Sequence, residues 1–313
     1  MEIAFFTEGN WSGKLPTTHP NMRTDLAWIH LLNATHYNIH EKNIIPNDLS
    51  IVIIPKNRVD VPLKDIKMNC KKLAIMQEGP CDYWTEYTIA NQITYLTLLS
   101  QADFILCHNE CDVPYYRGLT NKSVYVMPTA MVEESIPIND SQVLDFEQRS
   151  GAIIGGNMCQ WYNGMVSLLV ARLYSDVVYA PSMGRKVTGE DRIDGLKHLS
   201  YCNWSDWMKE LNKFQVAVHL MPTVAAGTFS LNCAYLGIPC IGNVLVDTQS
   251  KCHPLLSVDV TDIDSAIHLI KLLKNDRDFY MEQSNHSRNA YKNIYHSSKF
   301  KEIMAEIIGN NLQ

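Results

Sequence analysis

The chain has 313 residues, of which 46% are hydrophobic and 19% are charged. This composition excludes a disordered chain, a collagen-like repeat and a coiled coil, and the length suffices for about two domains. Lys and Arg total 27 and Asp and Glu total 33, which gives a net charge of −6. The balance excludes a global basic field for binding nucleic acid, although a local basic groove remains compatible with it.

Cysteine usage and the N-terminal sequence indicate a cytoplasmic protein, in the host cytoplasm if the protein is viral. The nine cysteines are odd in number, show no C-x-x-C spacing and lie partly in apolar runs, as in LGIPCIG. Such thiols are expected to be reduced and buried. The start, MEIAFFTEGN, lacks the basic segment of a secretory signal. No apolar run reaches the length of about 18 residues that a membrane span needs, so we expect no membrane association.

The first half of the chain alternates short apolar runs with helical patterns. This alternation predicts stacked βαβ units and a mostly parallel sheet. The apolar runs predict strands at 3–6, 51–55, 72–76, 103–107 and 123–128. The helical patterns predict helices at 23–34, around 87–100 and from about 112 to 119.

The second half repeats this organisation after a polar stretch. Residues 129–149 have no sustained period and are interpreted as the connection between two domains. Strands are then expected at 151–156, 176–180, 215–222 and 238–243. Helices are expected at 163–174, 206–214, 228–237, 263–281 and 285–310, the third of them closed by a glycine. The chain therefore reads as two α/β units placed end to end.

Ligands of open parallel sheets bind outside the carboxyl ends of the strands, so the loops that follow the strands are the candidate sites. The loop after the first strand, EGNWSGKLPTTHPNMR, contains Gly9, Gly13 and Lys14, a set suited to wrapping a phosphate. The alternative is a surface loop that happens to contain glycine. It is no Walker loop, because its spacing is one residue short and Leu15 replaces the Ser or Thr that binds magnesium.

A second candidate lies where the run ending at Pro222 leads into the helix expected at 228–237. Gly227 permits close approach to the backbone, Thr228 and Ser230 offer hydroxyls, and Asn232 follows one turn later. Amides at a helix N-terminus attract anions, although a simple N-cap explains Thr228 equally well. The nearest basic pair in this half is Arg185-Lys186, which would neutralise a diphosphate or else form a solvated charged loop.

Carboxylates and imidazoles at strand ends are candidates for acid–base chemistry. Glu78, His19 and Glu8 are the candidates, and the first and last of them follow strands directly. His219 lies inside an apolar run, which is more typical of a core histidine. No metal site is expected, because the cluster of Cys107, His108 and Cys111 has no fourth ligand nearby.

The layout resembles GT-B glycosyltransferases, and within them the retaining, glycogen-synthase-like group. The stretch 232–240, NCAYLGIPC, is similar to that group's E-A-M-A-x-G-x-P-V motif. The group's two glutamates fall on Val224 and Asn232, so its carboxylate contact to ribose is missing. The resemblance implies two Rossmann-like domains: 1–135, joined by a C-terminal helix at 295–313 that crosses back, as the acceptor domain, and 150–294 as the nucleotide-sugar domain.

The opening segment TEGNWSGKLPTTHPNMRTDLAWIHLLNATHYN also looks similar to phage glycosyltransferases that modify hydroxymethylated bases in DNA. The two resemblances imply a retaining glycosyltransferase with a nucleotide sugar, foremost a UDP-sugar, as donor and without a required metal. Its acceptor would be a hydroxyl, such as that of hydroxymethylcytosine in double-stranded DNA. Two alternatives stay open: a nucleotide-sugar epimerase, and a non-catalytic protein that binds glycans or nucleic acid.

Overall fold

The computed structural model describes residues 1–16, 19, 21–56, 58–182 and 187–312. The chain divides into two compact units, of which the first comprises Met1–Val132 with Ser297–Gln313 and the second comprises Glu133–His296. Each unit has its own sheet and its own buried apolar core. None of the helices formed by the described residues combines the length and the hydrophobicity needed to cross a bilayer.

The described part of the first unit forms a seven-stranded sheet in the order β2-β3-β1-β4-β5-β6-β7. Neighbouring strands are parallel except for β2, which pairs with β3 in the antiparallel sense. The strands are β1 (Ile3–Thr7), β2 (Gly13–Lys14), β3 (Thr35–Asn38), β4 (Asn47–Ile54), β5 (Cys70–Gln77), β6 (Phe104–Cys107) and β7 (Ser123–Val126). All five residues of β1 are buried, as expected for an inner strand covered on both faces.

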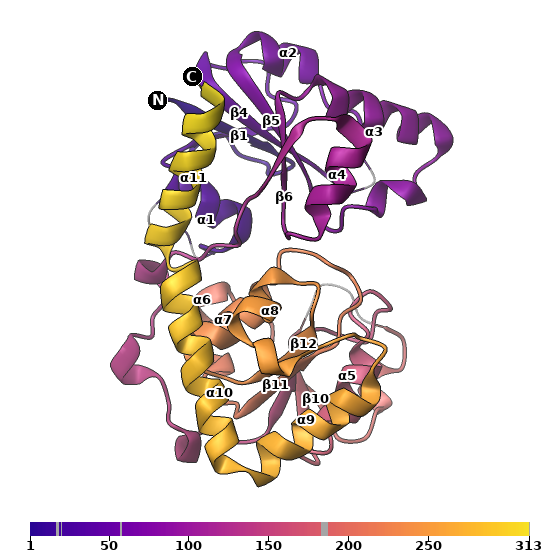
Figure 1. Ribbon diagram of the computed structural model, residues 1–313, viewed down its shortest axis with the longest axis vertical. Helices are drawn as coiled ribbons and strands as arrows, with labels where there is room; N and C mark the ends of the chain where they lie inside the picture. The colour runs from indigo at the N-terminus through magenta and orange to yellow at the C-terminus, as the bar shows by residue number, and fades with distance from the viewer. Residues whose placement is uncertain (17–18, 20, 57, 183–186, 313) are drawn as a thin grey trace. The chain divides into compact units, whose positions relative to one another are not determined.

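Helices cover this sheet (Figure 1). They are α1 (Thr24–Leu31), α2 (Leu63–Met68), α3 (Ile89–Gln101), α4 (Asp112–Thr120) and α11 (Ser297–Leu312). Helix α3 begins where the Thr88 hydroxyl accepts a hydrogen bond from the backbone N–H of Asn91 at 3.3 Å, which is an N-cap. Helix α11 comes from the far end of the sequence and packs against β5.

The second unit has a six-stranded sheet in the order β10-β9-β8-β11-β12-β13 among its described residues, with every pair parallel. Its strands are β8 (Ala152–Ile154), β9 (Val178–Ala180), β10 (Leu196–His198), β11 (Val216–His219), β12 (Cys240–Asn243) and β13 (Ser257–Val258). Its helices are α5 (Gly164–Ala171), α6 (Trp204–Leu211), α7 (Thr228–Leu236), α8 (Asp247–Cys252), α9 (Ile263–Asn275) and α10 (Arg277–Ala290). Short 3₁₀ turns complete the two units at Tyr83–Glu86, Glu133–Ser135, Asp140–Gln142, Phe146–Gln148, Glu190–Arg192 and Pro254–Leu256.

The structure confirms the prediction of two α/β units with parallel sheets. The long polar segment predicted after the first strand contains β2, and the polar stretch THYN forms β3, which sequence patterning missed. The prediction for the C-terminal region was wrong in one respect, because the helices break at different places. Asp276 caps a new helix by accepting the Phe279 N–H at 2.9 Å, and a π-helical turn at Tyr291–Tyr295 separates α10 from α11.

Candidate functional site

In an open α/β sheet, ligands bind outside the carboxyl ends of the strands where the strand order reverses. In the first unit this reversal lies between β1 and β4, because β2 and β3 continue to one side and β5 to β7 to the other. Glu8 and Gly9 follow β1, and Lys56 follows β4 after a single proline. The topology therefore brings these residues to one crevice of the first unit.

Lys56 pairs with Glu78, the residue directly after β5. Their Nζ and Oε1 atoms lie 3.8 Å apart, and the Lys56 backbone N–H donates to Glu78 Oε2 at 3.3 Å. The Glu78 backbone N–H in turn donates to the carbonyl of Ile54 at 2.9 Å, which fixes it beside the end of β4. Gly79 has a φ of +83°, and a Cβ at this position would lie 2.6 Å from Cε of Lys56. The glycine thus makes room for the lysine stem.

A neutral imidazole lies near this pair. Burial, and secondarily the Lys56 charge, lowers the pKa of His108 to about 4. His108 follows β6 directly, and its ring lies 5.9 Å from that of Trp28. Among the described residues, its Nδ1 atom has no hydrogen-bond partner, and neither does Oε1 of Gln77, the last residue of β5. Adjacent strands therefore end in buried polar atoms that a ligand can satisfy.

Asp25, in the first turn of α1, adds a second carboxyl group near that of Glu78. Burial raises its pKa, and the nearby Glu78 charge raises it further, while two backbone hydrogen bonds and Arg23 oppose the change. Thr24, immediately before it, has a φ of +55°, a conformation that costs energy in a β-branched residue. Its backbone N–H donates to the carbonyl of Ala130 at 3.1 Å, which holds the strained turn in place.

The reversal of strand order in the second unit lies between β8 and β11. Gly155 follows β8, and a Cβ there would lie only 2.4 Å from the ring of His219, the last residue of β11. Burial lowers the pKa of His219 to about 4, so its ring is neutral near pH 7. Its Nε2 atom has no hydrogen-bond partner in the part of the chain that the structure describes, and its ring lies 5.1 Å from that of Phe229 in the first turn of α7.

Gly227 is the N-cap of helix α7 and has a φ of +66°. A Cβ at Gly227 would lie 2.0 Å from Oγ1 of Thr248, and that hydroxyl donates to the Gly227 carbonyl at 2.8 Å. The Ser230 hydroxyl is 2.7 Å from the same Thr248 oxygen and 3.0 Å from the Gly227 carbonyl. The hydroxyls therefore fix the start of α7. The first-turn amides of Phe229 and Ser230 have no acceptor within the helix, so this end attracts anions.

Asn232 is buried and serves the interior of the second unit. In the orientation that satisfies its amide, the nitrogen donates to the Thr228 carbonyl at 3.1 Å and the oxygen accepts from Trp207 Nε1 at 3.0 Å. Thr228 itself is the first residue of α7. Of the predicted donor-binding residues in this unit, Gly227, Thr228, Ser230 and Asn232 are thus brought together around one helix start.

The opposite end of α7 carries a buried cation. Arg149 donates to the carbonyls of Leu236 at 2.5 Å and Gly237 at 3.1 Å, and to the backbone and side-chain oxygens of Asn212. Gly237 has a φ of +66° and ends the helix, which confirms the predicted glycine closure. The guanidinium thereby neutralises the negative end of the helix dipole and leaves the positive end at the crevice.

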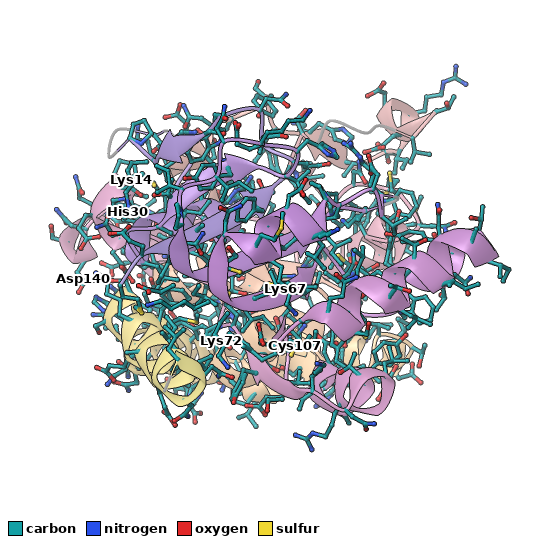
Figure 2. All side chains as sticks on the ribbon, turned by 90° about the horizontal axis from the view of Figure 1, so that it is seen from above. Lys14, His30, Lys67, Lys72, Cys107 and Asp140 are labelled. Atoms are coloured by element: carbon teal, nitrogen blue, oxygen red, sulfur yellow. The ribbon has the colours of Figure 1, made fainter. Side chains whose placement is uncertain are left out.

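The remaining predicted residues are not part of this helix start. Gly13 and Lys14 form β2, which β3 separates from β1, and Nζ of Lys14 donates to the carbonyl of Asn33 at 2.5 Å. Figure 2 shows Lys14 well away from Cys107 at the end of β6. Nδ1 of His19 accepts the backbone N–H of Asn21 at 3.1 Å, and Glu8 is exposed. Arg185 and Lys186 lie outside the described residues.

Sequence reasoning missed Lys56 and Asp25 and treated His219 as a core residue. Lys56 follows a predicted strand almost directly, so the strand-end rule was the signal that pointed to it. Asp25 carried no such signal, because its burial arises from packing at the start of α1. Within the described ranges, no group of three or more His, Cys, Asp or Glu side chains is placed to hold a metal ion.

Comparisons with solved structures identify the fold. Sucrose-phosphate synthase from Thermosynechococcus elongatus is similar with a TM-score of 0.73 at 10% identity, over 99% of this chain and 98% of that one. Anabaena HepE in complex with UDP has a TM-score of 0.68 at 10% identity, over 99% and 100%. An alpha-glucosyltransferase in complex with UDP and a 13-mer DNA containing a HMU base has a TM-score of 0.64 at 11% identity, over 99% of both chains.

The chain is therefore structurally close to the GT-B glycosyltransferases, as its sequence resemblance predicted. No family model matches the chain, and no curated protein matches its sequence significantly.

Proposed function

We propose that the protein is a glycosyltransferase that uses a nucleotide sugar, foremost a UDP-sugar, as donor. The observation that carries this proposal is the crevice of the second unit, where glycine backbone, the neutral His219 ring and the N-terminus of α7 meet at the reversal of strand order. Solved structures of the same fold with UDP bound support it. Helix amides and close backbone approach suit a diphosphate without requiring a metal.

The first unit supplies the groups proposed for the acceptor. Transfer breaks the bond between the anomeric carbon and the phosphate oxygen, whose electron pair leaves with the nucleoside diphosphate, and forms a bond from that carbon to the acceptor oxygen. The acceptor hydroxyl loses its proton. Glu78, the residue after β5, is our candidate to orient the acceptor hydroxyl or accept its proton, and Lys56 holds the Glu78 carboxylate in place. Retention of anomeric configuration is proposed from the sequence resemblance.

A hydroxymethylated base in DNA is a candidate acceptor. It is favoured by the opening segment of the sequence and by the similarity to the alpha-glucosyltransferase solved with DNA containing a HMU base. Incubation with a labelled UDP-sugar and hydroxymethylated DNA tests it directly. Label in the DNA supports this acceptor, whereas transfer only to other hydroxyl compounds removes it. The anomeric coupling constant of the product, measured by NMR, decides between retention and inversion.

Thermal unfolding with a panel of nucleoside diphosphates and nucleotide sugars tests the donor site. A ligand at about 100 times its Kd adds about 2.7 kcal/mol to stability. We expect stabilisation by UDP in the wild type and its loss in Gly155→Ala, since the added Cβ would displace His219. Gly118→Ala is the matched control, because its Cβ would meet no atom of the described residues within 4 Å. Equal stabilisation of both variants by UDP would contradict this donor site. Chelators should change neither result.

The same samples distinguish the two alternative functions. An epimerase converts a nucleotide sugar to its epimer without any acceptor, whereas a transferase shows at most slow hydrolysis. A non-catalytic binding protein is stabilised by DNA or glycan and by no nucleotide. Either outcome overturns the proposed transferase.

A further inference from the structure

An open hollow lies on the surface of the first unit, beside the loop that follows β1. Asn10, Trp11, Ser12, Asn38 and Glu41 line it. Three of these residues come from the β1–β2 loop, and the other two come from the end of β3 and the turn after it. Since β3 pairs directly with β1, the hollow borders the crevice at which the strand order reverses.

The aromatic wall of the hollow is fixed before any ligand arrives. The ring of Trp11 stacks on that of His36 at a centroid distance of 3.9 Å, and His36 Nε2 is held by the Thr7 hydroxyl at 2.8 Å. Gly9 allows this stacking, because a Cβ there would lie 3.1 Å from His36 and 3.2 Å from Nε1 of Trp11. His36 is 1% exposed, so the indole rests on a buried support. Such preorganisation lowers the entropy cost of binding.

Hydrogen bonds within the loop fix the polar side of the hollow. Asn38 Nδ2 donates to the Gly9 carbonyl at 2.9 Å, and the Asn38 backbone N–H donates to the Ser12 hydroxyl at 3.3 Å. The Ser12 hydroxyl donates to Glu41 Oε2, and Glu41 Oε1 accepts the backbone N–H groups of Lys42 and Asn43, both at 2.9 Å. These backbone hydrogen bonds lower the pKa of Glu41, so it is a carboxylate near neutral pH.

A rigid aromatic face next to a carboxylate and amides selects a particular ligand chemistry. An indole face packs against the apolar face of a sugar ring, while a carboxylate accepts hydrogen bonds from its hydroxyls. The negative charge of Glu41 repels phosphate groups and thus disfavours a nucleic-acid backbone here. We propose that this hollow, defined by Asn10, Trp11, Ser12, Asn38 and Glu41, is a binding subsite for a neutral saccharide that is part of the acceptor.

This inference rests on the proposed transferase and favours, over a hydroxymethylated base in DNA, a carbohydrate acceptor longer than the single unit that reacts. The subsite lies beside the acceptor-side crevice, so it holds a sugar residue next to the one that receives the transferred group. Loss of the Trp11 ring is then expected to raise the KM for a saccharide acceptor at least tenfold and to leave the KM for the nucleotide sugar unchanged.

Fluorine NMR of protein labelled with 5-fluorotryptophan tests the subsite. Maltotriose, cellotriose, chitotriose, uridine and a short DNA duplex are titrated separately, and Trp11→Phe assigns the resonance. We expect one of the trisaccharides to shift the Trp11 signal, and Gly9→Ala or Glu41→Gln to weaken that shift. Tyr201→Ala is the control, since that ring is 80% exposed and lies in the other unit.

The outcomes separate this inference from the proposed function. If UDP stabilises the protein and no saccharide shifts the Trp11 signal at millimolar concentration, the subsite is wrong and the transferase stands. A Trp11 shift with DNA or uridine alone also overturns the saccharide assignment. If UDP has no effect while a trisaccharide shifts Trp11, the subsite stands as a glycan-binding site and the transferase fails.

Discussion

The two sheets present different chemistry at their carboxyl edges. In the first unit β5 and β6 lead directly into Glu78 and His108, and β4 leads into Lys56 after one proline; all three side chains are titratable. In the second unit β8 leads into Gly155, β11 ends at a neutral histidine, and the N-cap of α7 is a glycine. The two sheets therefore differ at their carboxyl edges. Titratable side chains lie at the edge of the first sheet, and glycines that let a ligand approach the backbone lie at the edge of the second.

This difference supports a division of labour. Proton transfer needs titratable side chains that lie close together, and the first unit holds such side chains. A diphosphate needs close backbone approach and a helix dipole, and the second unit supplies both while Arg149 occupies the far end of the helix. The fold alone does not dictate either chemistry, which depends on the residues at the strand ends.

The largest effect is expected from pH, and it should affect both units. Burial lowers the pKa of His36 and His108 in the first unit, and of His219 and His253 in the second, to about 4 in each case. In the unfolded chain each of these histidines binds its proton near pH 6.5. Their contribution to stability is therefore complete above that pH and declines as pH falls toward 4. Each histidine contributes a slope of up to about 1.4 kcal/mol per pH unit.

Urea unfolding between pH 7 and pH 4.5 measures this decline. His36→Gln and His253→Gln remove one titrating group from each unit and should flatten the slope of that unit. A free energy of unfolding that stays constant over this range contradicts the neutral buried state of these rings.

Loss of the Arg149 guanidinium is expected to destabilise the second unit selectively. Arg149→Ala leaves the carbonyls of Leu236, Gly237 and Asn212 buried without their donor, which should cost about 3 kcal/mol. The control is Arg277→Ala, since Arg277 pairs with Glu147 at an exposed site and its loss should cost much less. Equal losses of unfolding free energy in the two variants argue against the capping role of Arg149.

The chemistry proposed for the first unit is tested by Glu78→Gln. If Glu78 orients or accepts the acceptor proton, kcat should fall by about 100-fold while UDP binding is retained. Glu86→Gln serves as the matched control, because Glu86 is an exposed acid in the nearby 3₁₀ turn. If the Glu78 variant keeps the wild-type kcat, another residue must act on the acceptor proton. Glu8 is then the first candidate to substitute.

The smallest effect is expected from Lys56→Met. Removing this cation should raise the pKa of His108, since the lysine charge contributes to its lowering. Loss of the half-exposed pair with Glu78 should reduce stability by less than about 1 kcal/mol. Histidine titration by NMR measures the first change, and a His108 pKa that stays constant shows that burial alone accounts for it.

Several elements could be predicted because they depend on local patterns. Continuous apolar runs such as IAFF and FILC mark strands covered on both faces, and the αL conformation at Gly237 follows from a glycine after a helical pattern. The break at Asp276 was missed because an N-cap inside a long helical period looks the same as a surface aspartate. The strand β3 was missed because its sequence, THYN, has little apolar character.

The sequence by itself determined the α/β class, the two parallel sheets and the loops that follow their strands, because hydrophobic period and turn chemistry act over a few residues. Only the tertiary structure decided which of those loops meet, since the reversal of strand order depends on how distant strands pair. It likewise lowered the histidine pKa values, engaged Asn232 with Trp207 and stacked Trp11 on His36, because burial and contact arise only when segments far apart in the chain pack together.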